Sequence, residues 1–485
     1  MVCAFGRRAK TTDRRPPVVT ESKHTKVKAI KVQFEQEENV TAFGGIGLVE
    51  RLALRLGLWG DLEKALGARR GRYGWVEILK TAAAGLLTGS QGTYATQEIR
   101  QERALLDLLG VEGAPEEATF WRSLGDLGRP KPLEAVAGVQ RRWAREILAR
   151  AERKSLLYES FFPVFGDGEL SEGSPRREGT KVIESKGQGL LWTTVFTGPV
   201  GAAQRLCAPG EGEQTALRAM LPEVVKEVLK PLRLVSCALL LVDSLHGDGP
   251  TLEEVESLGI HYVAGANKLS QTERVLSDQP ASQWEDTGAV KVFGWAESAV
   301  CVCSMQCEGW SRKRTLAGRR WRCEGELFYR YAGVLTDLHP RHVKGMMARG
   351  LSYGRSIWRL YDYKAGQEDY YKDLLIDLGL HHPPCQEYRR NAAFFAIGML
   401  AHTLARATDL LGGQQEDRGR MTRRDGRERK RPTPRRWRIA TLRRRLLTIP
   451  ARIAAHARTA TVTFLGLSDV TRAMIERFWT CLCRC

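Results

Sequence analysis

The stretch Tyr361-Asp-Tyr-Lys364-Ala-Gly-Gln-Glu368-Asp-Tyr-Tyr-Lys372-Asp-Leu-Leu-Ile-Asp-Leu-Gly379 places one carboxylate between two cations at helical spacing. Lys364, Glu368 and Lys372 are four residues apart, so on a helix they share one face. Ordinary surface helices also carry such pairs, and each is worth only about 0.2–0.5 kcal/mol. The spacing alone therefore favours a plain surface helix, and the residues that follow are needed to assign a function.

The stretch is followed by a Gly-Leu turn, His381-His-Pro-Pro384 and an apolar helical segment, 391–404, that begins Asn-Ala-Ala. This order, with Tyr-x-x-Lys-x-x-x-Glu-x-x-x-Lys before it, resembles the third-acid region of insertion-sequence transposases of the DDE class. The resemblance implies an RNase H-like core in which three carboxylates hold Mg²⁺ (or Mn²⁺), with Glu368 as the third. The family usually has Arg at the position of Lys364, and Lys cannot grip a phosphate in the bidentate way of Arg.

Composition favours a polyanionic partner. The 485 residues include 75 Lys and Arg against 56 Asp and Glu, a formal net charge of +19. A balance this basic points to nucleic acid. No uncharged apolar run reaches the eighteen or so residues that span a bilayer, so we expect a cytoplasmic, nucleoid-associated protein with no membrane partner.

The periodicity of apolar residues changes along the chain. Over 44–150 they recur at intervals of three and four, as in helices, and from residue 155 the runs become β-prone. We predict an α/β fold with an RNase H-like mixed-sheet core. The predicted segments are a disordered basic arm (1–43), a helical DNA-binding and dimerisation region (44–150), the first part of the core (151–266), a β-rich insertion (267–360), the third-acid helix with a core-packing helix (361–411) and a basic C-terminal tail (412–485).

The second acid is predicted at Asp243. The run 234–242 is apolar apart from Ser236, which is typical of a central strand buried on both faces. A helix over 251–259 and a strand over 260–265 complete a β-α-β unit. Asp243 then stands at the carboxyl end of a strand, where open α/β sheets place their chemistry.

The first acid is missing from its expected place. The family pattern has an Asp on the first strand, predicted here over 155–165, and a match on Gly166 puts that Asp on or beside Tyr158. Glu159 is the nearest carboxylate, but strand alternation turns it to the opposite face. Asp167 lies beyond the predicted strand, in an expected turn. Three interpretations stay open: Glu159 substitutes through a bulge, Asp167 reaches in, or the site is degenerate.

A basic block runs over 418–445, with fourteen Lys and Arg against two acidic residues. Such a block is solvated and disordered without a polyanion, and the segment 437–458 resembles the family's C-terminal helix and basic turn. The residues predicted to contact DNA are Tyr361, Lys364, Lys372, Arg435, Arg436, Arg443, Arg444 and Arg445.

The leading hypothesis is a transposase of a bacterial insertion sequence. It binds the double-stranded terminal repeats of the element and target DNA, assembles as a homo-oligomer on DNA, and catalyses metal-dependent strand cleavage and transfer. The alternative is a catalytically inactive, transposase-derived DNA-binding protein that represses or inhibits related elements. A basic RNA-associated protein is a third interpretation that rests on charge alone.

Overall fold

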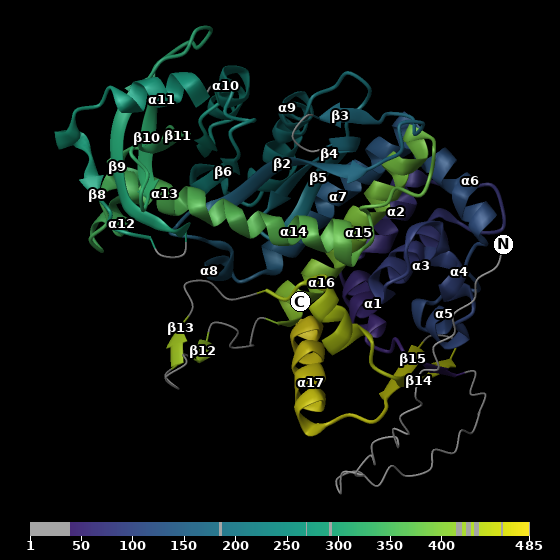
Figure 1. Ribbon diagram of the computed structural model, residues 1–485. Coiled ribbons are helices and arrows are strands. Elements are labelled where there is room, and N and C mark those ends of the chain that lie inside the picture. The colour runs from purple at the N-terminus through teal and green to yellow at the C-terminus, as the bar shows by residue number, and fades with distance from the viewer. Residues whose placement is uncertain are drawn as a thin grey trace, which may run out of the picture. The chain divides into compact units, whose positions relative to one another are not determined.

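The computed structural model describes residues 39–183, 187–267, 269–290, 293–413, 420–422, 428–430, 436–456 and 459–484. The arm predicted over 1–43 lies outside these residues as far as residue 38, as does most of the basic block between 414 and 435. The fold is a mixture of helices and one large mixed sheet (Figure 1). Within the described ranges, no helix is both long and apolar enough to cross a membrane.

Helices make up the first part of the described chain. Apolar side chains such as Leu52, Leu62 and Phe120 are fully buried, because each helix turns one stripe of them inward. The long helix α7 contacts α2, α15 and strand β5, so it joins this region to the sheet. The helices are α1 (Ile46–Arg55), α2 (Leu58–Leu66), α3 (Trp75–Thr88), α4 (Ala95–Arg100), α5 (Arg103–Leu109), α6 (Glu117–Leu127) and α7 (Pro130–Arg150).

The centre of the sheet is built from β2 (Phe162–Glu172), β4 (Gly187–Thr197), β5 (Val200–Leu206), β6 (Ala238–Val242) and β7 (His261–Gly265). Their spatial order is β5-β4-β2-β6-β7. β4 is antiparallel to β2 and β5, whereas β2, β6 and β7 are mutually parallel. Every residue of β6 is buried, as expected for a strand with parallel neighbours on both sides.

The strand predicted over 155–165 was misplaced. The chain forms a short helix, α8 (Arg153–Leu156), and then a tight turn in which Glu159 and Ser160 have φ angles of 49° and 76°. Only after this turn does β2 begin, at Phe162. The apolar run that suggested an earlier strand is therefore split by two residues in the left-handed region.

The Gly166-Asp167-Gly168 segment, predicted as a turn, lies inside β2. A Cβ at Gly166 would lie 2.7 Å from Leu217 Cδ1, and one at Gly168 would lie 1.8 Å from Glu213 Oε2. Both neighbours belong to α9 (Glu213–Val224), which crosses this part of the sheet. The two glycines therefore permit a helix to pack closely on the strand. Close approach of another element is one reason for glycine inside a strand.

The sheet continues past β7 through β11 (Arg330–Thr336), β10 (Arg314–Cys323), β9 (Trp295–Met305) and the short β8 (Glu285–Asp286), all antiparallel. Helix α13 (Tyr353–Asp362) packs against these strands. Figure 1 shows them at the opposite end of the sheet from β5. The range 267–360 therefore extends the core sheet and does not form a separate one.

A continuous helical run crosses the molecule beside the sheet (Figure 1). It consists of α13, a 3-10 segment (Tyr363–Gln367), α14 (Glu368–Lys372) and a π-helical turn (Asp373–Asp377). The long buried helix α15 (Tyr388–Gly412) follows it and contacts α3, α6, α7 and α17. The last described elements are α16 (Ile439–Leu442), β14 (Ala451–His456), β15 (Thr459–Phe464) and α17 (Asp469–Arg484), with β14 paired to β1 (Val40–Thr41).

Candidate functional site

Two aspartates meet at the middle of the sheet. β2 and β6 pair in parallel, with Phe165 opposite Leu241. The pairing ends there, and Asp167 and Asp243 each follow this last pair by two residues. Both lie near Tyr361, whose pKa is raised by burial and by their charges. Asp243 directly follows the last residue of β6, so its side chain stands at the carboxyl end of the strand.

The Asp243 carboxylate is held in its charged form. Its Oδ1 accepts hydrogen bonds from the backbone N–H groups of Leu245 and His246, at 3.1 and 3.3 Å, and lies 2.8 Å from the His246 Nδ1 atom. Burial raises the pKa of Asp243, but His246 and the charge of Lys364 outweigh burial and lower that pKa to about 2. A full negative charge therefore stands at this edge of the sheet at neutral pH.

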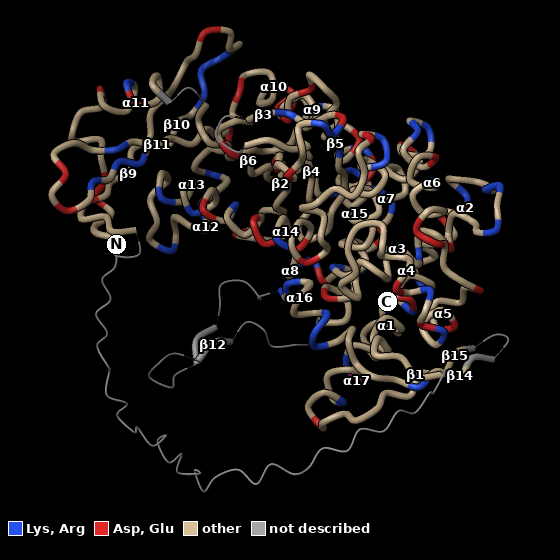
Figure 2. Tube along the Cα trace, turned by 45° about the vertical axis from the view of Figure 1, so that its right-hand side comes forward, with Lys and Arg blue, Asp and Glu red and all other residues tan. Residues whose placement is uncertain are grey.

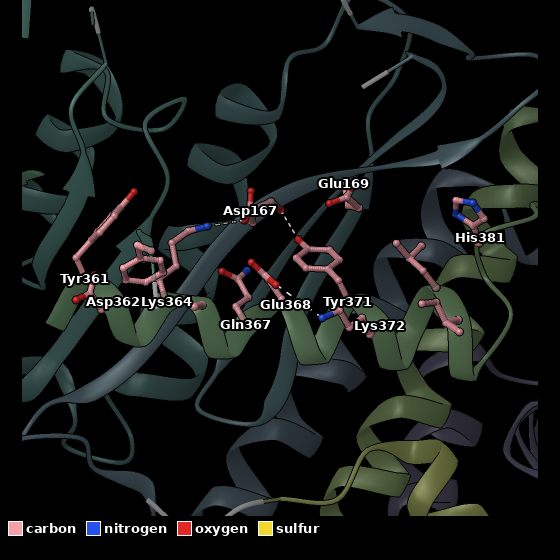
Figure 3. A pocket seen from close by; sticks show the side chains of 14 residues that line it. Asp167, Glu169, Tyr361, Asp362, Lys364, Gln367, Glu368, Tyr371, Lys372 and His381 are labelled. Carbon is pink, nitrogen blue, oxygen red and sulfur yellow. Dashed lines mark hydrogen bonds and ion pairs between the residues drawn. The ribbon is translucent and has the colours of Figure 1, made fainter. Parts of the chain in front are cut away.

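Asp167 is tied to the helical run that carries Glu368. The Lys364 ammonium lies 2.8 Å from Asp167 Oδ2, and the Tyr371 hydroxyl donates a hydrogen bond of 2.7 Å to the Asp167 carbonyl oxygen (Figure 3). The Tyr371 hydroxyl also lies 2.6 Å from the hydroxyl of the buried Thr194 on β4. These contacts fix the height of the helix over the strand.

Glu368 opens the helix α14 and is directed into a cavity of about 820 Å³ that Asp167 also lines (Figure 3). Its side chain is 73 % exposed, and its nearest cation is Lys372, at 3.7 Å. Lys364 and Tyr361 line the same cavity. A solvent-open space thus has four carboxylates, those of Asp167, Glu169, Asp362 and Glu368, and two lysines on its walls.

The far side of the same helical run is anchored by buried charges. The Asp373 carboxylate is fully buried, and it accepts hydrogen bonds from Arg406 and from Arg438, the latter at 3.0 Å. Arg438 also donates to Asp377 at 2.7 Å. These bonds join the helical run to α15 and to the start of α16, so Glu368 is carried by a well-supported helix.

Glu159 does not line this cavity. Its carboxylate pairs with Arg349 and, at 2.8 Å, with Arg359. It stands in the turn before β2, and the ring of its neighbour Tyr158 stacks on Tyr363 with centroids 3.8 Å apart. Of the two carboxylates considered for the first acid, the structure brings Asp167 to the cavity and leaves Glu159 in an ion-pair cluster.

Two residues at the site were missed by the sequence analysis. Atoms of Glu213 and His246 that could bind a metal lie within 4.8 Å of each other and of an Asp167 carboxylate oxygen. Both residues are buried. The spacing Asp243-x-x-His246 was a signal in the sequence, since a histidine three residues after a strand-end acid can fold back onto it. Nothing in the sequence indicated that α9 would bring Glu213 against β2.

Tyr361 is a hydrogen-bond donor on the cavity wall. Burial, followed by the charges of Asp243 and Asp167, raises the pKa of Tyr361 to about 12. Its hydroxyl therefore stays protonated at neutral pH. Lys372 lies on the same wall beside Glu368.

The predicted C-terminal DNA contacts divide into two kinds. Arg443 donates to the carbonyl oxygens of Leu86, Leu87 and Asp377, and burial lowers its pKa, so it has a structural role, and its contact with DNA stays a prediction. Arg436 similarly donates to the Ser155 carbonyl oxygen at 3.2 Å.

Arg444 and Arg445 are exposed, and Arg445 lies over the Trp437 ring at 5.4 Å. Figure 2 shows basic residues at α16, from which this segment continues. The π-helical turn that precedes Gly379 packs against α16. Arg435 lies outside the described residues.

Comparisons with known proteins give little further guidance. No protein-family model matches the chain, and no curated protein matches it. Among solved structures, a piggyBac transposase in a synaptic complex with hairpin DNA is similar over 78% of this chain and 77% of its own, with 12% sequence identity and a TM-score of 0.40. At that level the two chains share too little for one to assign a function to the other.

Proposed function

We propose that this chain is a DNA transposase of the DDE class, with Asp167, Asp243 and Glu368 as its three acids. The observation that carries the proposal is the parallel pairing of β2 with β6, which Asp167 and Asp243 each follow by two residues, together with the cavity that Asp167 shares with Glu368. The mixed order β5-β4-β2-β6-β7 supports an RNase H-like core, to which β8–β11 add the β-rich insertion.

The donor set fits divalent metal ions. Carboxylate oxygens are the ligands that Mg²⁺ and Mn²⁺ prefer, and the Lys364 ammonium already lies 2.8 Å from Asp167 as a cation in this place. Asp167, Asp243 and Glu368 would hold such ions, which would supply activation of the attacking oxygen and stabilisation of the leaving one. Lys364 is then free to turn toward a phosphate.

The remaining residues on the cavity wall suit a phosphodiester substrate. Lys372 offers a positive charge, and Tyr361 offers a hydroxyl proton that does not ionise at neutral pH. Exposed Arg444 and Arg445 lie on a segment that packs against the same helical run. With a net charge of +19, the chain is suited to hold double-stranded DNA across this face, and affinity should fall steeply with salt.

Terminal repeats of a bacterial insertion sequence are the DNA we propose, with assembly of a homo-oligomer on them. The inactive DNA-binding relative remains the second candidate, because Asp167 and Glu368 are each paired with a lysine of the same helical run. The two candidates differ in a single measurable property, the metal-dependent cutting of DNA.

The test is cleavage of a supercoiled plasmid that carries the DNA flanking this gene, with Mg²⁺ or Mn²⁺ present. We expect nicked and linear products with wild type, and none with Asp167→Asn, Asp243→Asn or Glu368→Gln, each of which should still shift the same DNA in a gel. Glu169→Gln is the matched control, since Glu169 lies two residues further along β2 and lines the same cavity. Binding without cutting by wild type would reject the transposase activity in favour of the inactive relative.

A further inference from the structure

Beneath the cavity lies a second group of possible metal ligands. Asp167 on β2, Glu213 at the first residue of α9 and His246 after β6 each offer an atom within 4.8 Å of the others. The three come from positions far apart in the chain, and Glu213 and His246 are 3% and 0% exposed. Only the packing of α9 on the sheet brings them together.

His246 is oriented like a metal ligand. Its Nδ1 atom lies 2.8 Å from the charged Asp243 carboxylate, which must accept a proton from the ring there. In that tautomer of the imidazole, the other ring nitrogen, Nε2, is the acceptor. Within the described part of the chain this buried atom has no hydrogen-bond partner. A buried acceptor without a partner costs free energy, and a bound cation would remove that cost.

The carboxylate behind the imidazole completes a familiar arrangement. Ligating histidines usually donate their other N–H to a carboxylate, which fixes the ring and makes the ligating nitrogen more basic. Asp243 occupies that position here. It would therefore hold the His246 ring in place from the side opposite the metal.

The backbone makes room for Glu213. A Cβ at Gly168 would lie 1.8 Å from Glu213 Oε2, so only glycine at this position of β2 allows the carboxylate to reach this depth. Glu213 is buried and Asp167 is partly buried, and two carboxylates this close together repel each other, so a cation between them is favourable. Lys364 binds the Asp167 carboxylate from the cavity side. A cation bound between Asp167, Glu213 and His246 would neutralise the charge on the buried side.

We propose that Asp167, Glu213 and His246 form a divalent metal site with one nitrogen and two carboxylate ligands, selective for a transition metal such as Mn²⁺ over Mg²⁺. Imidazole nitrogen favours first-row transition metals, whereas Mg²⁺ prefers oxygen ligands alone. The inference deepens the proposed function and rests on it for the role of Asp167. Its consequence is that Mn²⁺ holds β2, α9 and the loop after β6 in one geometry.

The experiment is Mn²⁺ binding to the full-length protein, followed by electron paramagnetic resonance. Loss of the free-ion signal gives the affinity, and pulsed measurements detect hyperfine coupling between the ion and a ligand nitrogen. We expect wild type to show nitrogen coupling that a tenfold excess of Mg²⁺ does not remove. His246→Gln should abolish the coupling and weaken binding about 10- to 100-fold.

Two further variants make the result specific. Glu213→Gln should weaken Mn²⁺ binding but keep the nitrogen coupling, which also covers the case in which His246→Gln does not fold. His381→Gln is the control, because His381 lines the outer cavity and is half-exposed. It should change neither affinity nor coupling.

The proposal is overturned if wild type binds Mn²⁺ without nitrogen coupling, if coupling survives in folded His246→Gln, or if it disappears in His381→Gln. It fails independently of the transposase proposal. Nitrogen coupling in a protein that does not cut DNA would support the metal site and reject the activity, whereas cutting without coupling would do the opposite.

Discussion

Replacement of Tyr371 by Phe should loosen the contact between the Glu368 helix and the strand that carries Asp167. The Tyr371 hydroxyl donates to the Asp167 carbonyl oxygen at 2.7 Å and receives a hydrogen bond from Thr194 at 2.6 Å. The substitution removes both bonds and adds no bulk. The Thr194 hydroxyl is fully buried and would lose this partner.

The magnitude follows from the cost of leaving a buried polar group without its partner, about 1–3 kcal/mol of unfolding free energy. Unfolding entropy is about 2.1 cal/mol/K per residue, so for a chain of 485 residues this corresponds to a fall in Tm of roughly 1–3 °C. A small displacement of Glu368 relative to Asp167 should also slow DNA cleavage by about 10- to 100-fold.

The assay is a comparison of Tyr371→Phe with Tyr370→Phe by calorimetry and by plasmid cleavage. Tyr370 is the adjacent residue, and its ring packs on Phe165 and Phe196. Among the described residues, no hydrogen bond involves its hydroxyl, so its substitution should change Tm and cleavage little. If the two variants have the same Tm and the same cleavage rate, the hydroxyl does not couple helix to strand and the reasoning is refuted.

Three further predictions concern charge. Arg406→Met should lower the free energy of unfolding, measured with urea, by about 3–5 kcal/mol, because it leaves the buried Asp373 carboxylate without a principal partner. Arg444 is exposed, so an equal effect of Arg444→Met would contradict this explanation. Burial raises the pKa of Glu256, but hydrogen bonds from Arg312 and Arg314 outweigh it and hold that pKa below 4.5. The stability that this group adds is thus present above its unfolded-state pKa and lost as pH falls through the lowered value. The Tm difference between wild type and Glu256→Gln should therefore shrink on acidification. A difference that stays constant with pH would exclude this linkage. Arg444→Ala should reduce the slope of log affinity against log salt by about 0.9 in a DNA-binding titration, with an unchanged slope arguing against a phosphate contact.

Local sequence patterns were sufficient for the parts of the site that depend on neighbouring residues. The run 234–242 predicts a buried strand; the structure has β6 over its second half, Ala238–Val242, with Asp243 directly after it, and a 3-10 turn at Val235–Cys237. The spacing of four predicts that Glu368 shares a helix face with Lys364 and Lys372, and all three line one cavity. Both inferences need only the period of a strand or helix, which is a property of a few consecutive residues.

The first acid could not be chosen from the sequence. Glu159 lies near the start of the predicted strand and Asp167 just beyond its end, and the choice between them depends on where β2 begins and ends. That boundary is set by a turn with positive φ angles at Glu159 and Ser160 and by the glycines that let α9 approach β2. A glycine in a turn and a glycine beneath a helix look alike in sequence, so only the packed structure separates them.

The sequence by itself determined a strongly basic chain, a buried central strand that ends at Asp243, and a helix that presents Glu368 between two lysines. Only the tertiary structure decided that Asp167 and Asp243 follow neighbouring parallel strands, that Glu213 and His246 lie beside Asp167, and that Arg443 binds backbone carbonyl oxygens. The physical reason is distance along the chain. Strand register and the burial of charge depend on partners tens to hundreds of residues away, and those partners are known only once helix and sheet have packed.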